Sequence, residues 1–412
     1  MTLAALIEEV LGDDLPIGVE AYDGSSAGPP NPPATLRLNS PDALRRIVTA
    51  PGELGFARAY VAGDIELEGD IYAILDLHDR VVNLKVGPHL IKRAVEELGG
   101  VRNVRRLPPP KEEVQLKGRR HSLRRDRQAV SHHYDVSNRF YEMVLGPSLT
   151  YSCAVWHDEA DTLEQAQANK YELVSRKLEL GPGKRLLDVG CGWGGMVMHA
   201  AEQHGVHAVG VTLSRQQAEL ATKRVHDAGL SDRVEIRLQD YREIDDGPYD
   251  AISSIGMFEH VGESKLGEYF SRLKGLLKYG GRLLNHGITR PTTSRASLPR
   301  RSFSNRYVFP DGELLEVGRV VTRMQQTGFE VRHLESLREH YNLTLRRWVA
   351  NLEKRWDDAV AEVGAARARV WRLYMAASAV DFLKGRLNID QVLAVRGTAS
   401  GGSGFALRET YE

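Results

Sequence analysis

The chain is poor in cysteine, carries no net charge and lacks long apolar runs. Its two cysteines, Cys153 and Cys191, are too few for a disulfide framework or a cysteine-ligated metal cluster, and we predict no metal site. Basic and acidic residues balance at 55 each, so no overall field favours nucleic acid. No segment approaches the roughly 20 apolar residues of a membrane span, and residues 1–9 do not resemble a signal peptide. We therefore expect a cytoplasmic protein.

What is present is a globular composition, with 42% hydrophobic and 27% charged residues. A chain of 412 residues can bury a large core and is expected to hold two domains. We predict a smaller N-terminal α+β domain over 1–115, a basic linker over 116–129 and a catalytic domain over 130–412. Within the first domain, Ser40 and Pro41 predict a helix start, and 55–70 has a turn-rich pattern.

The segment from Val101 to Val130 holds ten lysine or arginine residues against three acids. One interpretation is a solvated hinge between domains, marked by the prolines at 108–110. The other is an electrostatic contact with anionic lipid, in which each basic residue contributes on the order of 1 kcal/mol. Both interpretations stay open from the sequence.

The most informative stretch is RLLDVGCGWGG at 185–195. An apolar strand runs directly into a glycine-rich turn, and a helix-forming segment follows. Glycines are needed because the loop backbone must pass close to a ligand with dihedral angles that a Cβ forbids. The free N–H groups at the following helix start favour an anionic group, such as a carboxylate. The stretch therefore predicts a nucleotide-binding α/β domain.

Strands and helices alternate after this loop, which predicts a doubly wound sheet. The expected strands are 185–189, 207–212, 234–238, 249–255 and 281–288, and the expected helices are 194–204, 215–229 and 264–279. The stretch 289–306 resembles a loop or lid, and helical patterns dominate 343–387.

The ends of the next two strands indicate which nucleotide binds. A dinucleotide-binding domain usually places an acid at the end of its second strand to bind a ribose. Thr212 occupies this zone instead, with Gln217 soon after. The third strand ends at Asp240 and Tyr241, an acid and an aromatic ring suited to an adenine amino group and its ring. This pattern favours S-adenosylmethionine over NAD.

Several short motifs lie outside the glycine loop: SHHYDVSNRFY at 131–141, TYSCA at 150–154, GMFEHVG at 256–262, NHGI at 285–288 and YNLTL at 341–345. With GCGWGG, GVTLS and QDYR in this order, the chain resembles the cyclopropane-fatty-acyl-phospholipid synthase family, which includes the mycolic-acid cyclopropane synthases, and in particular its actinobacterial members. The resemblance is strong over 130–350. It implies a class I S-adenosylmethionine-dependent methyltransferase, a Rossmann-like doubly wound α/β sheet with a smaller N-terminal lipid-binding α+β domain.

The resemblance also implies residue roles. The cofactor-binding positions would be Tyr134, Tyr151, Ser152, Asp188, Gly190, Gly192, Thr212, Gln217, Asp240 and Tyr241. Family members bind a bicarbonate ion that serves as base, and the positions that would hold it here are Cys153, Glu259, His286, the backbone of Ile288, and Tyr341. The roles of His132, His133 and His260 stay open between function and structure.

By the same resemblance, the methyl group goes to the cis double bond of a phospholipid acyl chain through a carbocation, which must be shielded from water. Proton loss with ring closure gives a cyclopropane. Proton loss without it gives a 10-methylene chain, which a separate reductase would convert to a 10-methyl branch. The family further implies peripheral contact with the inner face of the cell membrane and a homodimer. A non-catalytic lipid-binding protein and a nucleic-acid methyltransferase are the rival functions; no motif supports the second, and we expect no nucleic-acid partner.

Overall fold

The structure is a computed structural model that describes residues 2–12, 14–77, 88–114, 136–292, 302–310, 312–398 and 400–411, without the side chains of 88–91. These residues form two compact units, and each unit is discontinuous in sequence. Unit 1 comprises Met1–Gln115, Pro299–Pro310 and Trp356–Val380, and unit 2 comprises Leu116–Leu298, Asp311–Arg355 and Asp381–Glu412. The sequence did not predict that two later segments join the N-terminal part.

Unit 1 is built on a four-stranded sheet in the order β2-β1-β3-β4, in which only β1 and β3 run parallel. The strands are β1 (Gly18–Ala21), β2 (Ser26–Ala27), β3 (Ala34–Leu38) and β4 (Ile65–Gly69). The helices from the N-terminal part are α1 (Leu3–Leu11), α2 (Pro41–Thr49), α3 (Glu53–Ala62), α4 (Ile71–Leu75) and α6 (Pro88–Glu97).

Local sequence explains the start of α2 in this unit. The Ser40 side chain accepts a hydrogen bond from the Asp42 N–H, and Pro41 occupies the first helical turn, as predicted. The turn-rich interpretation of 55–70 is wrong, because the buried apolar residues there form α3 and then β4. Gly63 provides the left-handed C-cap that separates these two elements.

Buried ion pairs and hydrogen bonds link the separate segments of unit 1. Arg58 on α3 donates two hydrogen bonds of 2.7 Å to Glu113, and Tyr307 on α14 (Phe303–Tyr307) donates a third of 3.4 Å. Arg372 on α18 (Ala365–Leu383), which follows α17 (Trp356–Val363), donates to the Tyr60 hydroxyl at 3.2 Å. Each buried charge thus has a partner, without which burial would be costly.

Unit 2 is built on a seven-stranded sheet in the order β10-β11-β9-β8-β5-β6-β7. The strands are β5 (Arg185–Val189), β6 (His207–Thr212), β7 (Val234–Leu238), β8 (Tyr249–Ile255), β9 (Leu277–Thr289), β10 (Glu330–Ser336) and β11 (Asn388–Val395). The strands β5 to β9 run parallel, and β11 is antiparallel to both of its neighbours. The predicted doubly wound sheet is confirmed, with β9 starting at Leu277 rather than at 281.

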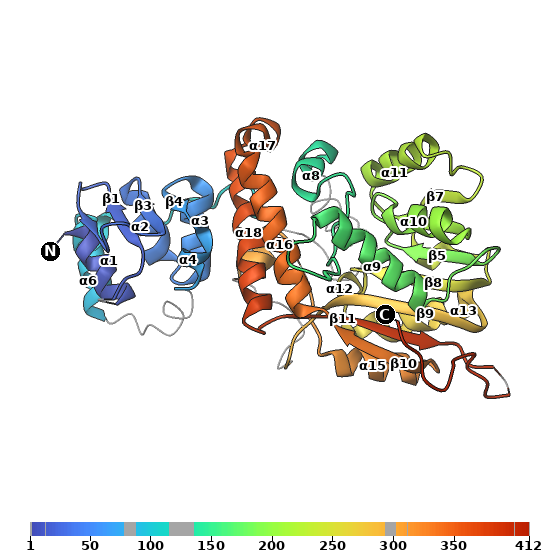
Figure 1. The fold of residues 1–412 in the computed structure, drawn as a ribbon. Helices are drawn as coiled ribbons and strands as arrows, with labels where there is room; N and C mark the ends of the chain where they lie inside the picture. Colours follow the sequence, from blue (N-terminus) through green and yellow to red (C-terminus); the bar gives the residue numbers. More distant parts are fainter. Residues whose placement is uncertain are drawn as a thin grey trace. The chain divides into compact units, whose positions relative to one another are not determined.

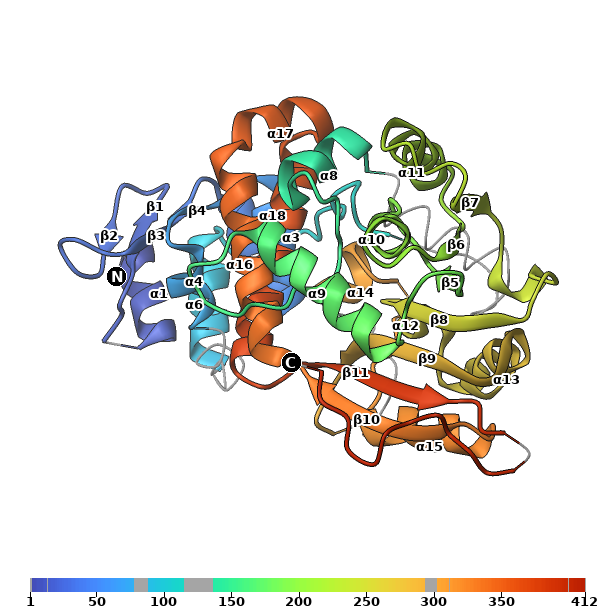
Figure 2. The same cartoon turned by 45° about the vertical axis from the view of Figure 1, so that its right-hand side comes forward.

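Helices cover both faces of this sheet (Figures 1 and 2). The helices α9 (Leu163–Lys177), α10 (Gly195–His204) and α11 (Arg215–Asp227) contribute to one apolar core, and α13 (Leu266–Leu276) and α15 (Val317–Gln326) contribute to another. The remaining helices are α8 (Asn138–Leu145), α12 (Phe258–Val261) and α16 (Arg338–Lys354). Among the helices of the described ranges, none is both long and apolar enough to cross a bilayer.

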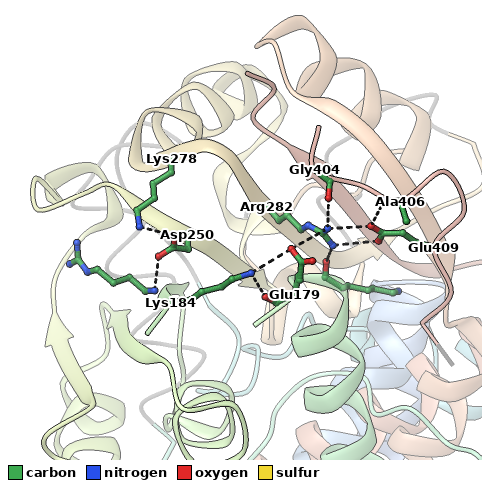
Figure 3. A network of polar contacts seen from close by, with 10 residues as sticks. Glu179, Lys184, Asp250, Lys278, Arg282, Gly404, Ala406 and Glu409 are labelled. Carbon is green, nitrogen blue, oxygen red and sulfur yellow. Dashed lines mark hydrogen bonds and ion pairs between the residues drawn. The ribbon is translucent and has the colours of Figure 1, made fainter. Parts of the chain in front are cut away.

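The C-terminal residues 400–411 contact the rest of unit 2 through Arg282, a buried side chain of β9 (Figure 3). Its guanidinium donates to the Glu409 carboxylate at 3.2 and 3.4 Å and to the Gly404 carbonyl at 3.4 Å. It also lies 3.9 Å from the centre of the Phe405 ring. The charge of this buried arginine is therefore neutralised by the tail that covers it.

Candidate functional site

A cavity of about 410 Å³ opens at the carboxyl ends of the central parallel strands of unit 2. Residues at the ends of β5, β6 and β8 line it, including Asp188, Thr212 and Ile255. The strand order reverses at this point, since β6 lies on one side of β5 and β8 on the other. Ligands of open α/β sheets bind at such a switch point.

The glycine loop forms the floor of the cavity. Gly190 and Gly192 both line it with positive φ angles, +83° and +55°. A Cβ on Gly190 would lie 2.5 Å from Met257 Cγ, so both its backbone angle and its surroundings require glycine. Asp188, which precedes Val189 at the end of β5, is buried and accepts a 2.6 Å hydrogen bond from Ser253. The backbone N–H groups of Gly190 and Cys191 both donate to the Val211 carbonyl, so these positions offer a ligand space beside the loop backbone.

The second and third strands place the remaining predicted contacts. Thr212 donates a 2.8 Å hydrogen bond to Gln217 Oε1, and both residues line the cavity. Tyr241 lines it as well, whereas Asp240 does not. The Asp240 carboxylate accepts hydrogen bonds of 2.6 and 2.8 Å from the Arg242 guanidinium, and Arg242 is the residue that faces the cavity. Direct adenine recognition by Asp240 stays a prediction.

Tyr151 and Ser152 also line the cavity, and they bring with them a residue that the sequence analysis missed. Lys170 on α9 is 1% exposed, and its ammonium donates a 3.1 Å hydrogen bond to Ser152 Oγ. Burial lowers the pKa of Lys170, and the opposing Asp188 charge partly restores it. A lysine on the inward face of an amphipathic helix is the sequence signal that could have identified it. Tyr134, together with His132 and His133, lies outside the described residues.

A second group of predicted residues lies at the junction of α12 and β9. Glu259 Oε1 accepts a 2.7 Å hydrogen bond from the backbone N–H of Ile288. Its other oxygen and both ring nitrogens of His286 are buried with no hydrogen-bond partner among the described residues. Burial raises the pKa of Glu259 to about 7 and lowers that of His286 to about 3. The site therefore holds a carboxyl group and a neutral imidazole with unmet hydrogen-bonding capacity.

Cys153 and Tyr341, the other two members of the predicted bicarbonate-binding set, both donate to the backbone carbonyl of Leu337. The Cys153 thiol donates to the Leu337 carbonyl at 3.7 Å, and the Tyr341 N–H donates to the same carbonyl at 3.1 Å. Burial raises the pKa of Cys153 well above its usual value, so the thiol is neutral. The Tyr341 ring packs edge-on against Trp348, which stacks on Tyr151 of the cavity wall.

Lys170 connects the two groups electrostatically. The charge of Lys170 lowers the pKa of both Cys153 and His286, which belong to the predicted bicarbonate-binding residues. The Lys170 side chain also lines the cofactor cavity. Two features thus lie near one another: a glycine-floored cavity suited to a nucleoside with an anionic tail, and a buried carboxyl group and neutral imidazole with unmet hydrogen bonds. This arrangement can move a group from a bound nucleoside and accept a proton nearby.

Comparisons with known proteins agree with this chemistry. The family model for mycolic acid cyclopropane synthetase matches residues 121–392. A probable fatty acid methyltransferase of Mycobacterium tuberculosis is 47% identical over 96% of this chain and 95% of its own length. The cyclopropane-fatty-acyl-phospholipid synthase of Escherichia coli is 32% identical over 90% of each chain. A crystal structure of mycolic acid cyclopropane synthase CmaA1 complexed with SAH and CTAB superposes with a TM-score of 0.62 at 33% identity, covering 65% of this chain and 98% of that one.

Proposed function

Because the chain belongs to the mycolic acid cyclopropane synthetase family, we propose that this S-adenosylmethionine-dependent methyltransferase acts on the cis double bond of an unsaturated phospholipid acyl chain, giving a cyclopropane. The observation that carries the proposal is the pair Glu259 and His286, buried beside the cofactor cavity with unmet hydrogen bonds. Methyltransferase activity toward lipid acyl chains follows from the family.

The cofactor cavity accounts for the methyl donor. The glycine loop at Gly190 and Gly192 leaves space for the methionine portion of S-adenosylmethionine. Thr212, Gln217 and Tyr241 line the same cavity, and we propose that the first two bind the ribose hydroxyls and that the Tyr241 ring packs against adenine. When bound, the sulfonium supplies an electrophilic methyl group.

The acceptor chemistry then places demands on the protein. The alkene's electron pair forms a bond to the methyl carbon, the methyl–sulfur bond breaks with its electrons staying on sulfur, and positive charge develops on the neighbouring chain carbon. The buried rings of Phe258 and Tyr341 can stabilise that charge, by about 0.5–2 kcal/mol each. Loss of a proton from the new methyl group and closure of the ring complete the cyclopropane.

We propose that bicarbonate accepts this proton. The residues present fit such an ion: Glu259 Oε2 and the His286 nitrogens are orphaned buried atoms that need partners. A Glu259 carboxyl with a pKa of about 7 can donate a hydrogen bond to the ion while Ile288 holds its other oxygen. Cys153 and Tyr341 are proposed as further neighbours.

The product test uses purified chain, vesicles of an unsaturated phospholipid and S-adenosylmethionine labelled in its methyl group. We expect the label in the lipid, with cyclopropane ring protons in the proton NMR spectrum. Glu259→Gln and His286→Gln should each lose most activity, whereas Glu202→Gln, at an exposed position of α10, should not. No label in lipid, or label in nucleic acid instead, would overturn the proposed acceptor.

The second candidate product has an exocyclic methylene. The relative at 47% identity is called a probable fatty acid methyltransferase and not a cyclopropane synthase, and this name supports the methylene product as the second candidate. Methyl transfer to the alkene serves both products. For the methylene, the hydrogen on the methylated carbon first shifts as a hydride to the neighbouring cationic carbon, and a methyl proton then leaves with formation of the double bond instead of the ring. Vinylidene protons in the same NMR spectrum would assign the methylene product and would require a separate reductase to reach a methyl branch.

The bicarbonate proposal is tested by the same assay in buffer freed of carbon dioxide. We expect the rate to fall several-fold and to recover on adding bicarbonate at constant pH. A rate that does not respond to either change, with methyl transfer intact, would rule bicarbonate out and leave Glu259 as the base.

We also propose peripheral contact with the inner face of the cell membrane and a homodimer. An acyl chain exposed to water costs about 0.8 kcal/mol per CH₂, so the substrate must pass directly from the bilayer to the site. Four of the ten basic residues counted between Val101 and Val130 are described, and all four are exposed: Arg102, Arg105, Arg106 and Lys111. A dimer would double such contacts, and sedimentation equilibrium would reveal a monomer if this part is wrong.

A further inference from the structure

Three side chains outside the proposed active site converge on one point between two helices. Glu172 comes from α9, and His199 and His204 come from α10. Their donor atoms all lie within 4.8 Å of one another. Glu172 Oε2 is 2.9 Å from His204 Nε2 and 3.5 Å from His199 Nε2, so both imidazoles face the same carboxylate oxygen.

The two separations from Glu172 Oε2, 2.9 and 3.5 Å, are close to those between ligand atoms of a small metal site. Zinc binds imidazole nitrogen and carboxylate oxygen at about 2.0–2.2 Å, which places neighbouring ligand atoms roughly 3–3.5 Å apart in tetrahedral geometry. Two imidazoles and a carboxylate suit zinc and other first-row divalent ions better than magnesium or calcium, which prefer all-oxygen sites. A water molecule would complete the coordination.

The surroundings orient the ligands. Arg176 donates a 2.8 Å hydrogen bond to Glu172 Oε1, which leaves Oε2 directed at the histidines. His199 packs against the Tyr171 ring at 5.6 Å, and its buried Nε2 has no hydrogen-bond partner among the described residues.

The side chains of His199, His204 and Glu172 are 17%, 19% and 33% exposed, so the cluster lies near the surface although the His199 Nε2 atom itself is buried. We propose that Glu172, His199 and His204 bind one divalent transition-metal ion, zinc in the first place, and that the ion joins α9 to α10. The sequence predicted no metal site, because that expectation rested on the two cysteines and not on the histidines.

Metal binding here would brace one wall of the cofactor cavity. The helix α9 carries Lys170 and Tyr171 to that wall, and α10 begins there at Gly195. The two helices are packed so closely that a Cβ on Gly195 would overlap the Tyr171 hydroxyl. The role is therefore structural, and it does not depend on the proposed lipid reaction.

The experiment uses untagged, full-length chain stripped with a chelator and titrated with zinc against a chromophoric competitor. We expect one ion per chain and a melting temperature raised by several degrees, because the ion binds the folded state only. Cobalt should bind at the same stoichiometry and give the visible absorption of a low-symmetry site.

The variants His199→Gln, His204→Gln and Glu172→Gln should each lose zinc binding and the melting shift. The control is His226→Gln, an exposed histidine whose Nδ1 lies 3.5 Å from an Asp227 oxygen but which has no second imidazole. It should bind zinc as the wild type does. Circular dichroism identifies any variant that fails to fold. No stoichiometric binding by the wild type, or binding retained in all three variants, would overturn the proposal.

Discussion

Glu259 shows how a single buried carboxyl couples folding to pH. Burial holds the pKa of Glu259 at about 7 in the folded protein, against an ordinary value of 4.5, and the hydrogen bond from Ile288 only partly offsets this. The folded state therefore retains the proton between these two pH values while the unfolded state releases it. The stability that this proton gives is complete below pH 4.5 and is lost as the pH rises through about 7.

We predict that Glu259→Gln removes this loss, since an amide does not titrate and its oxygen can still accept from Ile288. A shift from 4.5 to about 7 corresponds to about 3 kcal/mol. The free energy of unfolding of the variant, measured by urea titration, should gain about that much on the wild type between pH 4.5 and pH 8. Glu202→Gln serves as the exposed control. Parallel pH profiles of variant and wild type would contradict the prediction.

Most of the cofactor-binding residues that the sequence predicted line the cavity. Tyr151, Ser152, Thr212 and Gln217 all reach the cavity, because short motifs at strand ends determine their positions. Asp240 does not line it, because the nearby Arg242 takes up its carboxylate. Side-chain pairings of this kind depend on rotamers and on tertiary packing, which a sequence pattern does not specify.

At the scale of elements, the helix α12 and the strand β9 approach each other closely at Gly287. Gly287 has no side chain, and a Cβ there would overlap the ring of Phe258 and lie 3.0 Å from Glu259 Oε1. This approach allows Glu259 to reach the Ile288 N–H. One glycine in a buried strand thus sets the distance between the helix and the strand that carry the proposed proton-handling residues.

Gly287→Ala should accordingly destabilise unit 2 by about 1–3 kcal/mol through overpacking and should reduce methyl transfer more than tenfold. Gly275→Ala is the matched control, because nothing lies within 4 Å of its added methyl group on α13. That variant should keep full activity and gain up to about 1 kcal/mol in helix stability. Denaturant titration and the methyl-transfer assay would check both. Equal effects of the two substitutions would show that Phe258 simply moves aside.

The parallel strands were predictable, whereas the antiparallel pair was not. The strands β5, β6 and β8 are short apolar runs bounded by turns, the pattern of strands buried on both faces. The residues of β10 are polar at most positions and none is buried, and β11 begins with Asn388 after a long helix. The pairing of β10 with β11, and of β11 with β9, brings together residues about 50 to 110 positions apart, which no local periodicity reveals.

For the whole molecule, the sequence predicted a smaller N-terminal part but not its later contributions. Pro299–Pro310 and Trp356–Val380 belong to unit 1, and Arg372 supplies one of its buried hydrogen bonds. A helix in 356–380 shows the same amphipathic pattern whichever unit it packs against. The assignment of a helix to a unit follows from long-range contacts and not from the helix's own composition.

Binding of the whole chain to membranes is expected to be electrostatic. The chain should sediment with vesicles containing anionic phospholipid and be released by salt, since counterions screen such contacts. Replacing the four exposed basic residues by glutamine should weaken binding at least tenfold: Arg102, Arg105, Arg106 and Lys111. The control replaces four other exposed basic residues: Arg215, Lys223, Arg233 and Lys354. Salt-insensitive binding, or none, would contradict the expectation.

The discontinuous composition of unit 1 has a consequence for biosynthesis. Its last segment ends at Val380, 265 residues after the first segment ends at Gln115. At a translation rate of about 5–20 residues per second, the nascent N-terminal part waits roughly 13–50 s before α18 has been made. During that time Tyr60, the partner of Arg372, lacks its cover. Unit 1 can therefore finish folding only late in synthesis. Until then, its N-terminal hundred residues need protection by chaperones.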